Sequence, residues 1–368
     1  MPFVQTGDVS NARGLIRSFT QTLSAAGVSI SKVFPKGTLL MTIAANIGDV
    51  AELGFESACP DSLVAIVPSD GVCRRYLRRF LEMQKPKIHY LAPQNAQKNI
   101  NVDFLEMLTV LLAPPEEQYK ISAILDLWDL AIEDLESLLA AKAKHKRGLM
   151  QQLLAGKRRF KEFRSQRWRR FRLGQLLREV DRYVNFDDEH RYKLASIRRR
   201  SEGLFLREEL RGSEIKTKVM KTIRTGDFVL SKMQVVHGAW GLVTPKFDGM
   251  FVSDSYIALV PRDPQILKVE FFNYLSQTRH LRHLAHLACH GVHIEKMTFN
   301  LEDFLDEKIT IPPSVEEQSK IVAVLAGCDR EIELVQTQLR ALKEQKRGLM
   351  QKLLMGEVRV NPAKGGRA

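Results

Sequence analysis

The sequence predicts an α+β protein in which two α/β domains are separated and joined by two long antiparallel coiled-coil helices with a pseudo-two-fold repeat. Three observations predict this fold class. A stretch of about 45 residues occurs twice, its apolar residues recur at steps of three and four, and short β-rich runs with glycine turns precede each copy.

The repeat relates residues 116–160 (EEQYKISAILDLWDLAIEDLESLLAAKAKHKRGLMQQLLAGKRRF) to residues 316–360 (EEQSKIVAVLAGCDREIELVQTQLRALKEQKRGLMQKLLMGEVRV). The two stretches align without a gap at an offset of 200 residues, and about half of the aligned positions are identical. The segment KRGLMQ is the same in both copies. This identity indicates a duplicated element and argues against two unrelated surface helices.

Each copy carries the start and stop signals of one long helix. Prolines precede the first turn, at 114–115 in the first copy and 312–313 in the second, and Ser314 and Glu317 have the spacing of a capping box. Gly156 and Gly356 stand where a left-handed C-terminal cap is expected. At 1.5 Å per residue, a helix of about 35 residues spans roughly 50 Å.

The apolar spacing within each copy is typical of a coiled-coil seam, and because such a helix cannot bury its stripe alone, the two copies are natural partners. The long segment between them can return the chain, which favours antiparallel pairing. Gly148 and Gly348 lie inside the helices and either allow close approach of a partner helix or subunit, or are tolerated surface glycines. The residues predicted for helix pairing or partner binding are Leu125, Trp128, Ile132, Leu139, Gly148, Leu149, Leu325, Ile332, Leu339, Gly348 and Leu349.

The segments ahead of the helices share a framework but differ in detail. DSLVAIVP in the first corresponds to DSYIALVP in the second, each is followed by a helical stretch (Tyr76–Met83; Val269–Leu287), and each closes with a polar loop, a strand-like run and the prolines. The second segment also has a leading part, 168–190, with no counterpart in the first, so we expect the first domain to be N-terminally incomplete. The predicted domains are 1–114, the helix 115–156, 157–314 with its basic leading segment, the helix 315–357 and a flexible tail, 358–368.

Composition excludes several classes of protein. The 368 residues contain 44% hydrophobic residues, which suits a globular protein with buried cores. No apolar run approaches the roughly 18 residues of a membrane span, and the N-terminus lacks the layout of a signal peptide. The four cysteines have no ligand spacing and are expected to be reduced thiols in a cytoplasmic protein.

Positive charge is concentrated in one part of the chain. The formal net charge is +13, and residues 157–200 account for +10 of it. Residues 157–172 (KRRFKEFRSQRWRRFR) interleave basic side chains with Phe160, Phe163, Trp168 and Phe171, a pattern that suits contact with nucleic-acid phosphates. The alternative is a solvated linker without a partner.

Reading of DNA bases requires polar side chains on loops, because phosphate contacts carry no sequence information. The second segment offers Arg198, Arg199, Arg200, Lys216, Lys218, Lys232, Gln234, His237, Lys246 and His293. The first offers Gln5, Thr6, Asn11, Lys36, Asn46, Gln97, Lys98 and Asn99.

Signals for catalysis or metal binding are weak. His280, His283, His286, His290 and His293 with Cys289 could place two or three ligands on one helical face, but no acidic second shell or CxxC accompanies them, so we predict no metal. The sequence has no GxxxxGK[ST] loop, no GxGxxG after a strand and no [DN]PP[YF] tetrapeptide. We therefore predict a protein without an active site of its own.

Two variable domains, each followed by a long helix with EEQ-x-KI at its start and KRGLMQ-x-LL-x-G near its end, resemble the specificity subunit of type I restriction-modification systems. The loop APQNAQKNIN at 92–101 is similar to the turn that closes the family's target recognition domains. The resemblance implies that each domain reads half of a bipartite double-stranded DNA site and that the helices fix the spacer between the halves. It also implies two modification subunits, which bring S-adenosylmethionine for adenine methylation, and restriction subunits, which use ATP and Mg²⁺; this chain itself holds no cofactor and contacts no membrane.

Two other classes of function remain open from the residues alone. One is a sequence-independent DNA-binding coiled-coil protein, which predicts equal affinity for all duplexes and a steep salt dependence. The other is an inactive truncated specificity subunit that still binds its partners.

Overall fold

In the computed structural model the protein is a mixed α+β structure that divides into two compact units. Unit 1 consists of Met1–Leu138 and Val335–Ala368, and unit 2 of Leu139–Leu334. The structure describes residues 1–44, 46–91, 100, 102–185, 187–217, 219–291 and 297–360. Each long helix contributes one part to unit 1 and the other part to unit 2.

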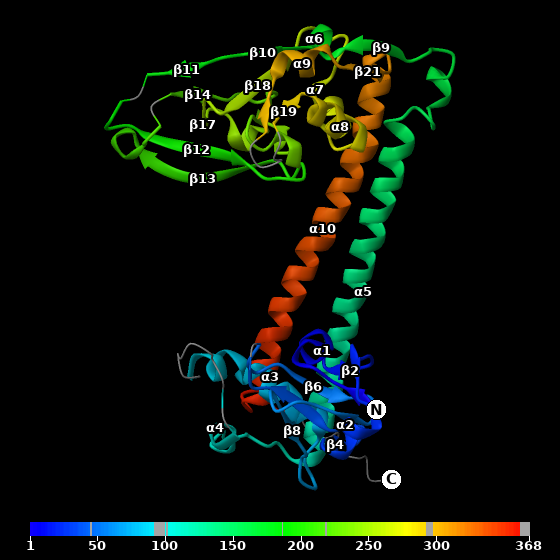
Figure 1. Ribbon diagram of the computed structural model, residues 1–368, viewed down its shortest axis with the longest axis vertical. Helices are drawn as coiled ribbons and strands as arrows, with labels where there is room; N and C mark the ends of the chain where they lie inside the picture. The colour runs from blue at the N-terminus through cyan, green and yellow to red at the C-terminus, as the bar shows by residue number, and fades with distance from the viewer. Residues whose placement is uncertain are drawn as a thin grey trace, which may run out of the picture. The chain divides into compact units, whose positions relative to one another are not determined.

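Unit 1 places a small α/β domain beside the start of the first long helix (Figure 1). In its described part, one sheet has the strand order β3-β1-β7-β4 and the other the order β2-β6-β5-β8. Leu39, Leu40 and Met41 of β5 are fully buried because this strand lies inside the second sheet. The elements are β1 (Pro2–Phe3), α1 (Thr6–Asn11), β2 (Leu15–Ile16), β3 (Gln21–Thr22), α2 (Ala25–Ser29), β4 (Val33–Phe34), β5 (Leu39–Thr42), β6 (Val50–Leu53), β7 (Ser57–Ala58), β8 (Leu63–Ile66), α3 (Arg74–Leu91) and α4 (Val102–Glu106).

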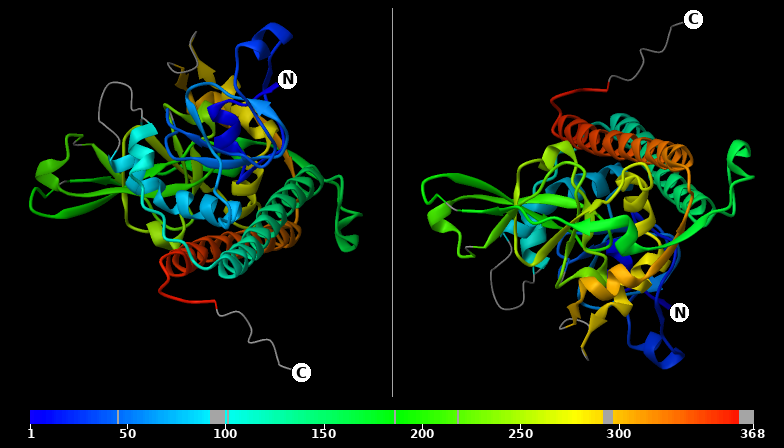
Figure 2. Two further views of the ribbon diagram at one scale, coloured as in Figure 1. Left: turned by 90° about the horizontal axis from the view of Figure 1, so that it is seen from below. Right: turned by 90° about the horizontal axis from the view of Figure 1, so that it is seen from above.

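Unit 2 is larger, and in its described part a four-stranded sheet, β10-β18-β15-β16, supports the helices α7 and α8. A second sheet, β11-β14-β17-β12-β13, includes the hairpin of β12 and β13, which projects from the unit in both views of Figure 2. The elements are η1 (Lys161–Phe163), β9 (Arg169–Arg172), α6 (Leu173–Leu176), β10 (Leu177–Glu179), β11 (Tyr183–Val184), β12 (Arg191–Ile197), β13 (Leu204–Arg211), η2 (Gly212–Glu214), β14 (Met220–Thr222), β15 (Phe228–Ser231), η3 (Val235–His237), β16 (Trp240–Leu242), η4 (Pro245–Phe247), β17 (Phe251–Ser253), β18 (Tyr256–Pro261), α7 (Val269–Ser276), α8 (Arg279–Leu287), β19 (Cys289–His290), β20 (Thr298–Phe299), α9 (Leu301–Asp306) and β21 (Lys308–Ile311).

The two long helices are α5 (Pro115–Leu153) and α10 (Val315–Leu354). Gly156 and Gly356 follow their ends with φ values of +66° and +74°, so the predicted left-handed glycine caps are confirmed. No helix in the described ranges is both long enough and apolar enough to cross a membrane.

Ion pairs give the direction of the long helices within each unit. In unit 1, Glu136 pairs with Lys343 at 2.6 Å, and Asp129 pairs with Lys346. In unit 2, Lys142 pairs with Glu331 at 2.9 Å and Lys146 with Asp329 at 2.5 Å. The number of the partner falls as the position along α5 rises, so α5 and α10 run antiparallel within each unit.

The residues predicted to pair the helices occupy buried or half-buried positions, with one exception. Leu125 shares a buried cluster with Leu349 in unit 1, and Leu325 shares one with Leu149 in unit 2. An added Cβ at Gly148 or Gly348 would meet no atom of the described chain within 4 Å, and Gly348 is exposed. Their use by a partner stays a prediction, as do the domain boundaries and the incomplete first domain. The other members of the set, Trp128, Ile132, Leu139, Ile332 and Leu339, are buried or half-buried.

The repeated EEQ motif fastens the segment after one long helix to the start of the other. Glu317 accepts two hydrogen bonds from the Arg159 guanidinium, at 2.8 and 2.7 Å, and Glu117 accepts the equivalent bonds from Arg359. The predicted capping box is therefore only half correct. Ser314 accepts from the Glu317 amide at 3.4 Å, but the Glu317 carboxylate binds Arg159 instead of turning back to the amide of Ser314.

The glutamine of the motif binds two loops in each unit, one before the long helix itself and one before the shorter helix α3 or α7. Gln118 accepts from the Cys73 amide at 2.7 Å and donates to the Ala113 carbonyl at 2.7 Å. Gln318 accepts from the Lys268 amide at 2.9 Å and donates to the Pro312 carbonyl at 3.1 Å. The residues repeated at the start of each long helix therefore form equivalent junctions between helix and domain in the two units.

Two local expectations differ from the structure. The helical stretch predicted over 269–287 is two helices, α7 and α8, because the hydroxyl of Thr278 accepts from the Leu281 amide and starts a new helix. The strand-like run before the prolines forms β21 in unit 2, but residues 108–113 of unit 1 form no strand, since no strand equivalent to β9 lies beside them among the described residues.

Candidate nucleic-acid interface

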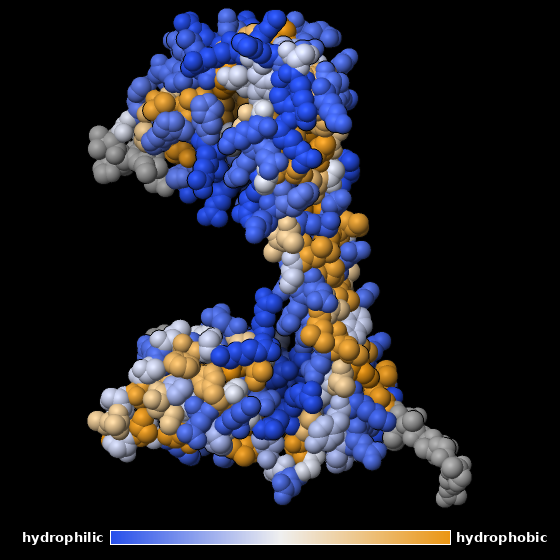
Figure 3. Space-filling view, turned by 90° about the vertical axis from the view of Figure 1, so that its right-hand side faces the viewer, coloured by the Kyte–Doolittle hydropathy of each residue, from blue (hydrophilic) through white to orange (hydrophobic). Residues whose placement is uncertain are grey.

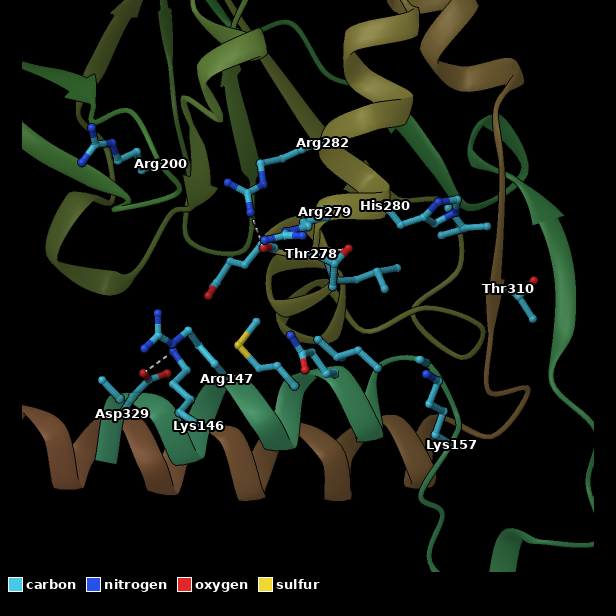
Figure 4. A pocket seen from close by; sticks show the side chains of 18 of the residues that line it. Lys146, Arg147, Lys157, Arg200, Thr278, Arg279, His280, Arg282, Thr310 and Asp329 are labelled. Atoms are coloured by element: carbon cyan, nitrogen blue, oxygen red, sulfur yellow. Dashed lines mark hydrogen bonds and ion pairs between the residues drawn. The ribbon is translucent and has the colours of Figure 1, made fainter. Parts of the chain in front are cut away.

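A hollow of about 1130 Å³ opens on unit 2, and its walls come from elements far apart in the sequence (Figure 4). The floor consists of Met150 of α5, Leu154 just after that helix and Ile332 of α10, and β21 contributes Ile309 and Thr310. The turn between α7 and α8 forms the opposite wall, together with the loop that carries Arg200.

Positively charged side chains dominate this hollow. Arg147, Lys157, Arg200 and Arg279 line it and are exposed, and in the described ranges no carboxylate forms an ion pair with them. Arg282 also lines it and donates to the Gln277 carbonyl at 3.5 Å. Uncompensated cations around a concave surface attract a polyanion and suit the phosphates of a nucleic acid.

A hydrogen-bonded carboxylate fixes the geometry beneath these cations. Asp329 of α10 accepts from Lys146 of α5 at 2.5 Å and from the Tyr274 hydroxyl of α7 at 2.6 Å. Burial raises the pKa of Tyr274, and the bond to the carboxylate raises it further, so the phenol remains a donor at neutral pH. Because α7 is held against both long helices, the helix that follows presents Arg279 and Arg282 toward Arg147, as Figure 4 shows.

The loop that carries Arg200 is held in an unusual backbone conformation. Arg200 and Ser201 have φ values of +62° and +60°, in the left-handed region that non-glycine residues rarely adopt. The Arg200 amide donates to the His237 carbonyl at 2.7 Å, and the Ser201 hydroxyl accepts from the buried Trp240 indole at 2.8 Å. The Arg200 side chain is thereby anchored to the η3 region through its own backbone.

Three of the residues predicted to contact DNA in the second segment thus come together, namely Arg200, Gln234 and His237. Gln234 flanks η3, and its buried side-chain oxygen has no hydrogen-bond partner in the described part of the chain. His237 is half-buried.

The other predicted residues of unit 2 are dispersed. Arg198 stacks over the Phe205 ring at 4.6 Å, Lys232 pairs with Asp254 at 4.0 Å, and Lys246 lies over the Phe247 ring at 5.7 Å. Arg199 and Lys216 are exposed. Lys218 and His293 lie outside the described residues.

In unit 1 four of the predicted residues form one group around α1. Gln5 precedes this helix, Thr6 and Asn11 are its ends, and the Asn46 amide donates to the Ser10 hydroxyl at 3.1 Å. Lys36 is exposed on the turn before β5 and is not part of the group. Gln97, Lys98 and Asn99 lie outside the described residues.

The aromatic rings of the basic leading segment lie against the core of unit 2, and its contact with nucleic-acid phosphates stays a prediction. Phe163 is buried, and Phe160, Trp168 and Phe171 pack against the core of unit 2, so these rings serve folding. Arg159 is bound to Glu317, whereas Arg169, Arg170 and Arg172 on β9 remain exposed. Lys157 is the one residue of the segment's basic side chains that lines the hollow.

The histidine cluster forms no metal site in the described part of the chain. His280, His283 and His286 are exposed along α8, and His290 is 2.6 Å from the Asp303 carboxylate. No group of three or more potential ligands occurs among the described residues.

Sequence reasoning missed the helical cations Arg147, Arg279 and Arg282. Arg147 belongs to the repeated KRG segment, which the sequence assigns to helix pairing and partner binding, and Arg279 and Arg282 lie among the histidines of the cluster. Residue spacing could not predict this arrangement, because the contact of Tyr274 of α7 with Asp329 and Lys146 of the long helices brings these arginines together.

Comparisons with known proteins agree with this picture. A model of the family described as type I restriction modification DNA specificity domain matches residues 1–142 and 168–344. The type I restriction enzyme MjaIX specificity subunit of Methanocaldococcus jannaschii is 32% identical over 106 residues, which cover 28% of this chain and 24% of that protein. The matched stretch thus spans about a quarter of that relative.

Solved structures share the fold along nearly the whole chain. A structure reported for complex assembly and conformational transition of the type I restriction-modification system has a TM-score of 0.60 and 18% identity, and the match covers 97% of this chain and 91% of that one. The specificity subunit from M. genitalium has a TM-score of 0.55 and 15% identity, with 96% and 88% covered. The HsdS subunit from Thermoanaerobacter tengcongensis has a TM-score of 0.50 and 17% identity, with 97% and 90% covered.

Proposed function

Because this chain belongs to the family of type I restriction-modification specificity subunits, we propose that it recognises a bipartite site on double-stranded DNA in the cytoplasm and directs partner subunits to it. Two modification subunits would methylate adenine with S-adenosylmethionine, and restriction subunits would cleave with ATP and Mg²⁺. The chain itself supplies recognition and no catalytic group.

The observation that carries this proposal is the hollow of unit 2. Its unpaired cations come from both a long helix and the domain, so a DNA backbone lying there would contact the two together. Arg200 lines it on a loop whose backbone is bonded to the η3 region, where Gln234 and His237 lie, and this arrangement suits contact with base edges. In unit 1 the group around α1 would read the other half of the site.

A methylation map tests the proposal directly. The chain is co-expressed with a modification subunit, and methylated adenines are mapped across a genome that lacks other methyltransferases. We expect one bipartite motif with a fixed spacer. Scattered methylation without a motif would favour the sequence-independent DNA-binding protein, and absence of methylation despite co-purification would favour the inactive specificity subunit.

The long helices carry a surface that suits the modification subunits. Figure 3 shows apolar side chains gathered along these helices. On the part of α5 that belongs to unit 1, four apolar side chains lie on one face of the helix and are exposed, which is unusual for a soluble surface. They are Tyr119, Leu127, Leu130 and Leu138, with exposed fractions of 59%, 67%, 57% and 42%.

Introducing negative charges on this apolar face of α5 should prevent binding of the modification subunit. In the double variant Leu127→Glu and Leu130→Glu, co-purification with the modification subunit is expected to fall at least tenfold, because burying two carboxylates in an apolar interface is costly. Thermal unfolding of the isolated chain should change little, since both leucines are exposed. Ile30→Glu, at an 88% exposed position outside the helices, is the matched control and should leave co-purification intact.

Shortening both helices together tests whether they set the spacer. Deletion of 136–142 with 333–339 removes one heptad from each helix at facing positions, as the ion pairs Glu136–Lys343 and Lys142–Glu331 indicate. Seven residues correspond to about 10.5 Å of helix, or roughly three base pairs of DNA. The methylated motif should keep its two halves with a spacer shorter by about three base pairs. An unchanged spacer would contradict the idea that the helices fix the distance between the halves.

A further inference from the structure

The histidines of α8 form one row on its exposed face. With 3.6 residues per turn, His280, His283 and His286 fall on the same side of this helix as Arg279, and all four residues are exposed. The opposite side is at most 6% exposed and consists of Leu281, Leu284 and Ala285. The helix is thereby fixed against the core of unit 2 with its histidines turned to solvent.

The charge of this helix is one-sided. Its sequence, RHLRHLAHL, holds two arginines and three histidines and no carboxylate. Ion pairs between residues three or four apart, which usually compensate the charges of a surface helix, therefore cannot form within α8. Histidine is also the side chain whose charge changes near neutral pH, so the positive charge of this face depends on pH.

The elements packed against α8 leave its histidines without a carboxylate partner. They are η3, α7, α9 and β19, and their carboxylates are Glu270, Glu302, Asp303 and Asp306. Asp303 is bonded to His290, and Asp306 pairs with Arg172 at 3.7 Å. The other titratable groups of these elements are His237, Tyr274, Cys289 and His290. In the ranges that the structure describes, none of these groups forms an ion pair with the three histidines of the row.

The row begins at the hollow of unit 2. Arg279 and His280 both line the hollow, and Figure 4 shows them at the start of α8. His283 and His286 follow along the helix, so the row spans about 9 Å at 1.5 Å per residue. This length matches two or three successive phosphates of one DNA strand, which are about 3.4 Å apart along the DNA axis. A DNA backbone that leaves the hollow along α8 would meet the histidines one after another.

We propose that α8 extends the phosphate contact of the hollow and makes it dependent on pH, because His280, His283 and His286 bind DNA phosphates in their protonated form. This inference rests on the proposed binding of DNA at the hollow. A phosphate beside an imidazole stabilises the protonated ring, so DNA binding takes up protons. By linkage, the affinity for DNA rises as the pH falls through the range in which histidine titrates, and it declines as the pH rises.

The triple variant His280→Gln, His283→Gln and His286→Gln tests the inference. The DNA affinity of the assembled complex is measured by fluorescence anisotropy at pH 6 and pH 8 and at one salt concentration. The unaltered complex should bind about tenfold more tightly at pH 6, since an average uptake of about half a proton over two pH units gives this factor. The triple variant should match it at pH 8 and lose most of the gain at pH 6. Glutamine is polar and a good helix former, so circular dichroism and thermal unfolding should stay unchanged.

His290→Gln is the matched control. His290 follows α8 closely and is exposed, but the Asp303 carboxylate already lies 2.6 Å from its imidazole. This variant should keep the full difference between pH 6 and pH 8. The salt dependence gives a second measurement. At pH 6 the slope of log K against log salt should be steeper in the unaltered complex than in the triple variant, by about 0.9 for each phosphate that a histidine binds, and at pH 8 the two slopes should coincide.

Two results would overturn this inference alone. One is a ratio of affinities between pH 6 and pH 8 that is the same in the triple variant as in the unaltered complex, and the other is an equal loss of that ratio in His290→Gln. In both cases specific binding at pH 8 would leave the proposed function intact. Absence of specific DNA binding at both pH values would instead overturn the proposed function and this inference together.

Discussion

Reversal of charge at Arg147 and Arg279 is expected to lower the DNA affinity of the assembled complex at least 100-fold near physiological salt. Both side chains line the hollow of unit 2, both are exposed, and neither has a carboxylate partner in the described ranges, so their charges are available to phosphates. Two glutamates remove two attractive contacts and add repulsion. A 100-fold loss corresponds to about 2.7 kcal/mol, within reach of two such contacts.

The salt dependence separates phosphate contact from misfolding. Each neutralised phosphate contributes about 0.9 to the slope of log K against log salt. The single variants Arg147→Gln and Arg279→Gln should each reduce the slope by about one, while the ratio of affinities for specific and random duplexes changes little. This is measured by fluorescence anisotropy over a range of salt concentrations.

Arg224→Gln is the matched control for these variants. Arg224 is exposed in the same unit, but Asp248 already lies 3.8 Å from its guanidinium. Its loss should leave both affinity and slope nearly unchanged. If the slope falls equally in all three variants, the effect depends on net charge and not on position. That result would contradict phosphate contact at the hollow.

Substitution of Glu317 by alanine is expected to lower the free energy of unfolding of unit 2 by about 3 kcal/mol, because it leaves a largely buried charge without its partner. Glu317 is fully buried, and the Arg159 side chain is only 14% exposed. The carboxylate also lies 3.4 Å from the Trp168 indole nitrogen. Calorimetry should therefore show an earlier transition for unit 2.

Neighbouring and repeated positions are the controls for Glu317. Glu316 is exposed, so Glu316→Ala should have little effect. Glu117→Ala should destabilise unit 1 less, because the Arg359 side chain is 59% exposed. Equal losses for Glu316→Ala and Glu317→Ala would contradict a specific role for the buried pair.

The Glu117 pair also has a defined pH dependence. The hydrogen bond from Arg359 holds the pKa of Glu117 below its ordinary value despite burial. Its contribution to stability is therefore present above the ordinary glutamate pKa and is lost as the pH falls through the lowered pKa.

The repeat made much of the framework predictable. Local signals such as Gly156 and Gly356 determine where the long helices end. A motif that occurs twice, such as EEQ, indicates that the same contacts form twice, even where the sequence does not show which contacts these are. The mixed α+β class followed from the same pattern.

The candidate site was less predictable, because tertiary packing assembles it. Arg147, Arg200 and Arg279 are separated by more than 50 residues from one another, and the anchoring of α7 through Asp329 and of the Arg200 backbone through His237 brings them to one hollow. The aromatic rings of the basic segment pack on the core of unit 2, which their interleaving with basic residues could not show.

The division of the long helices between the units has a consequence for synthesis on the ribosome. Unit 2 is one continuous stretch and is complete once Leu334 has emerged. Unit 1 needs Leu349, Leu353 and Leu354 for the cluster around Leu125, and these residues are translated after the whole of unit 2. The usual order, in which the N-terminal domain folds first, is therefore reversed, and the core of the nascent first domain stays partly uncovered until Leu354 has emerged.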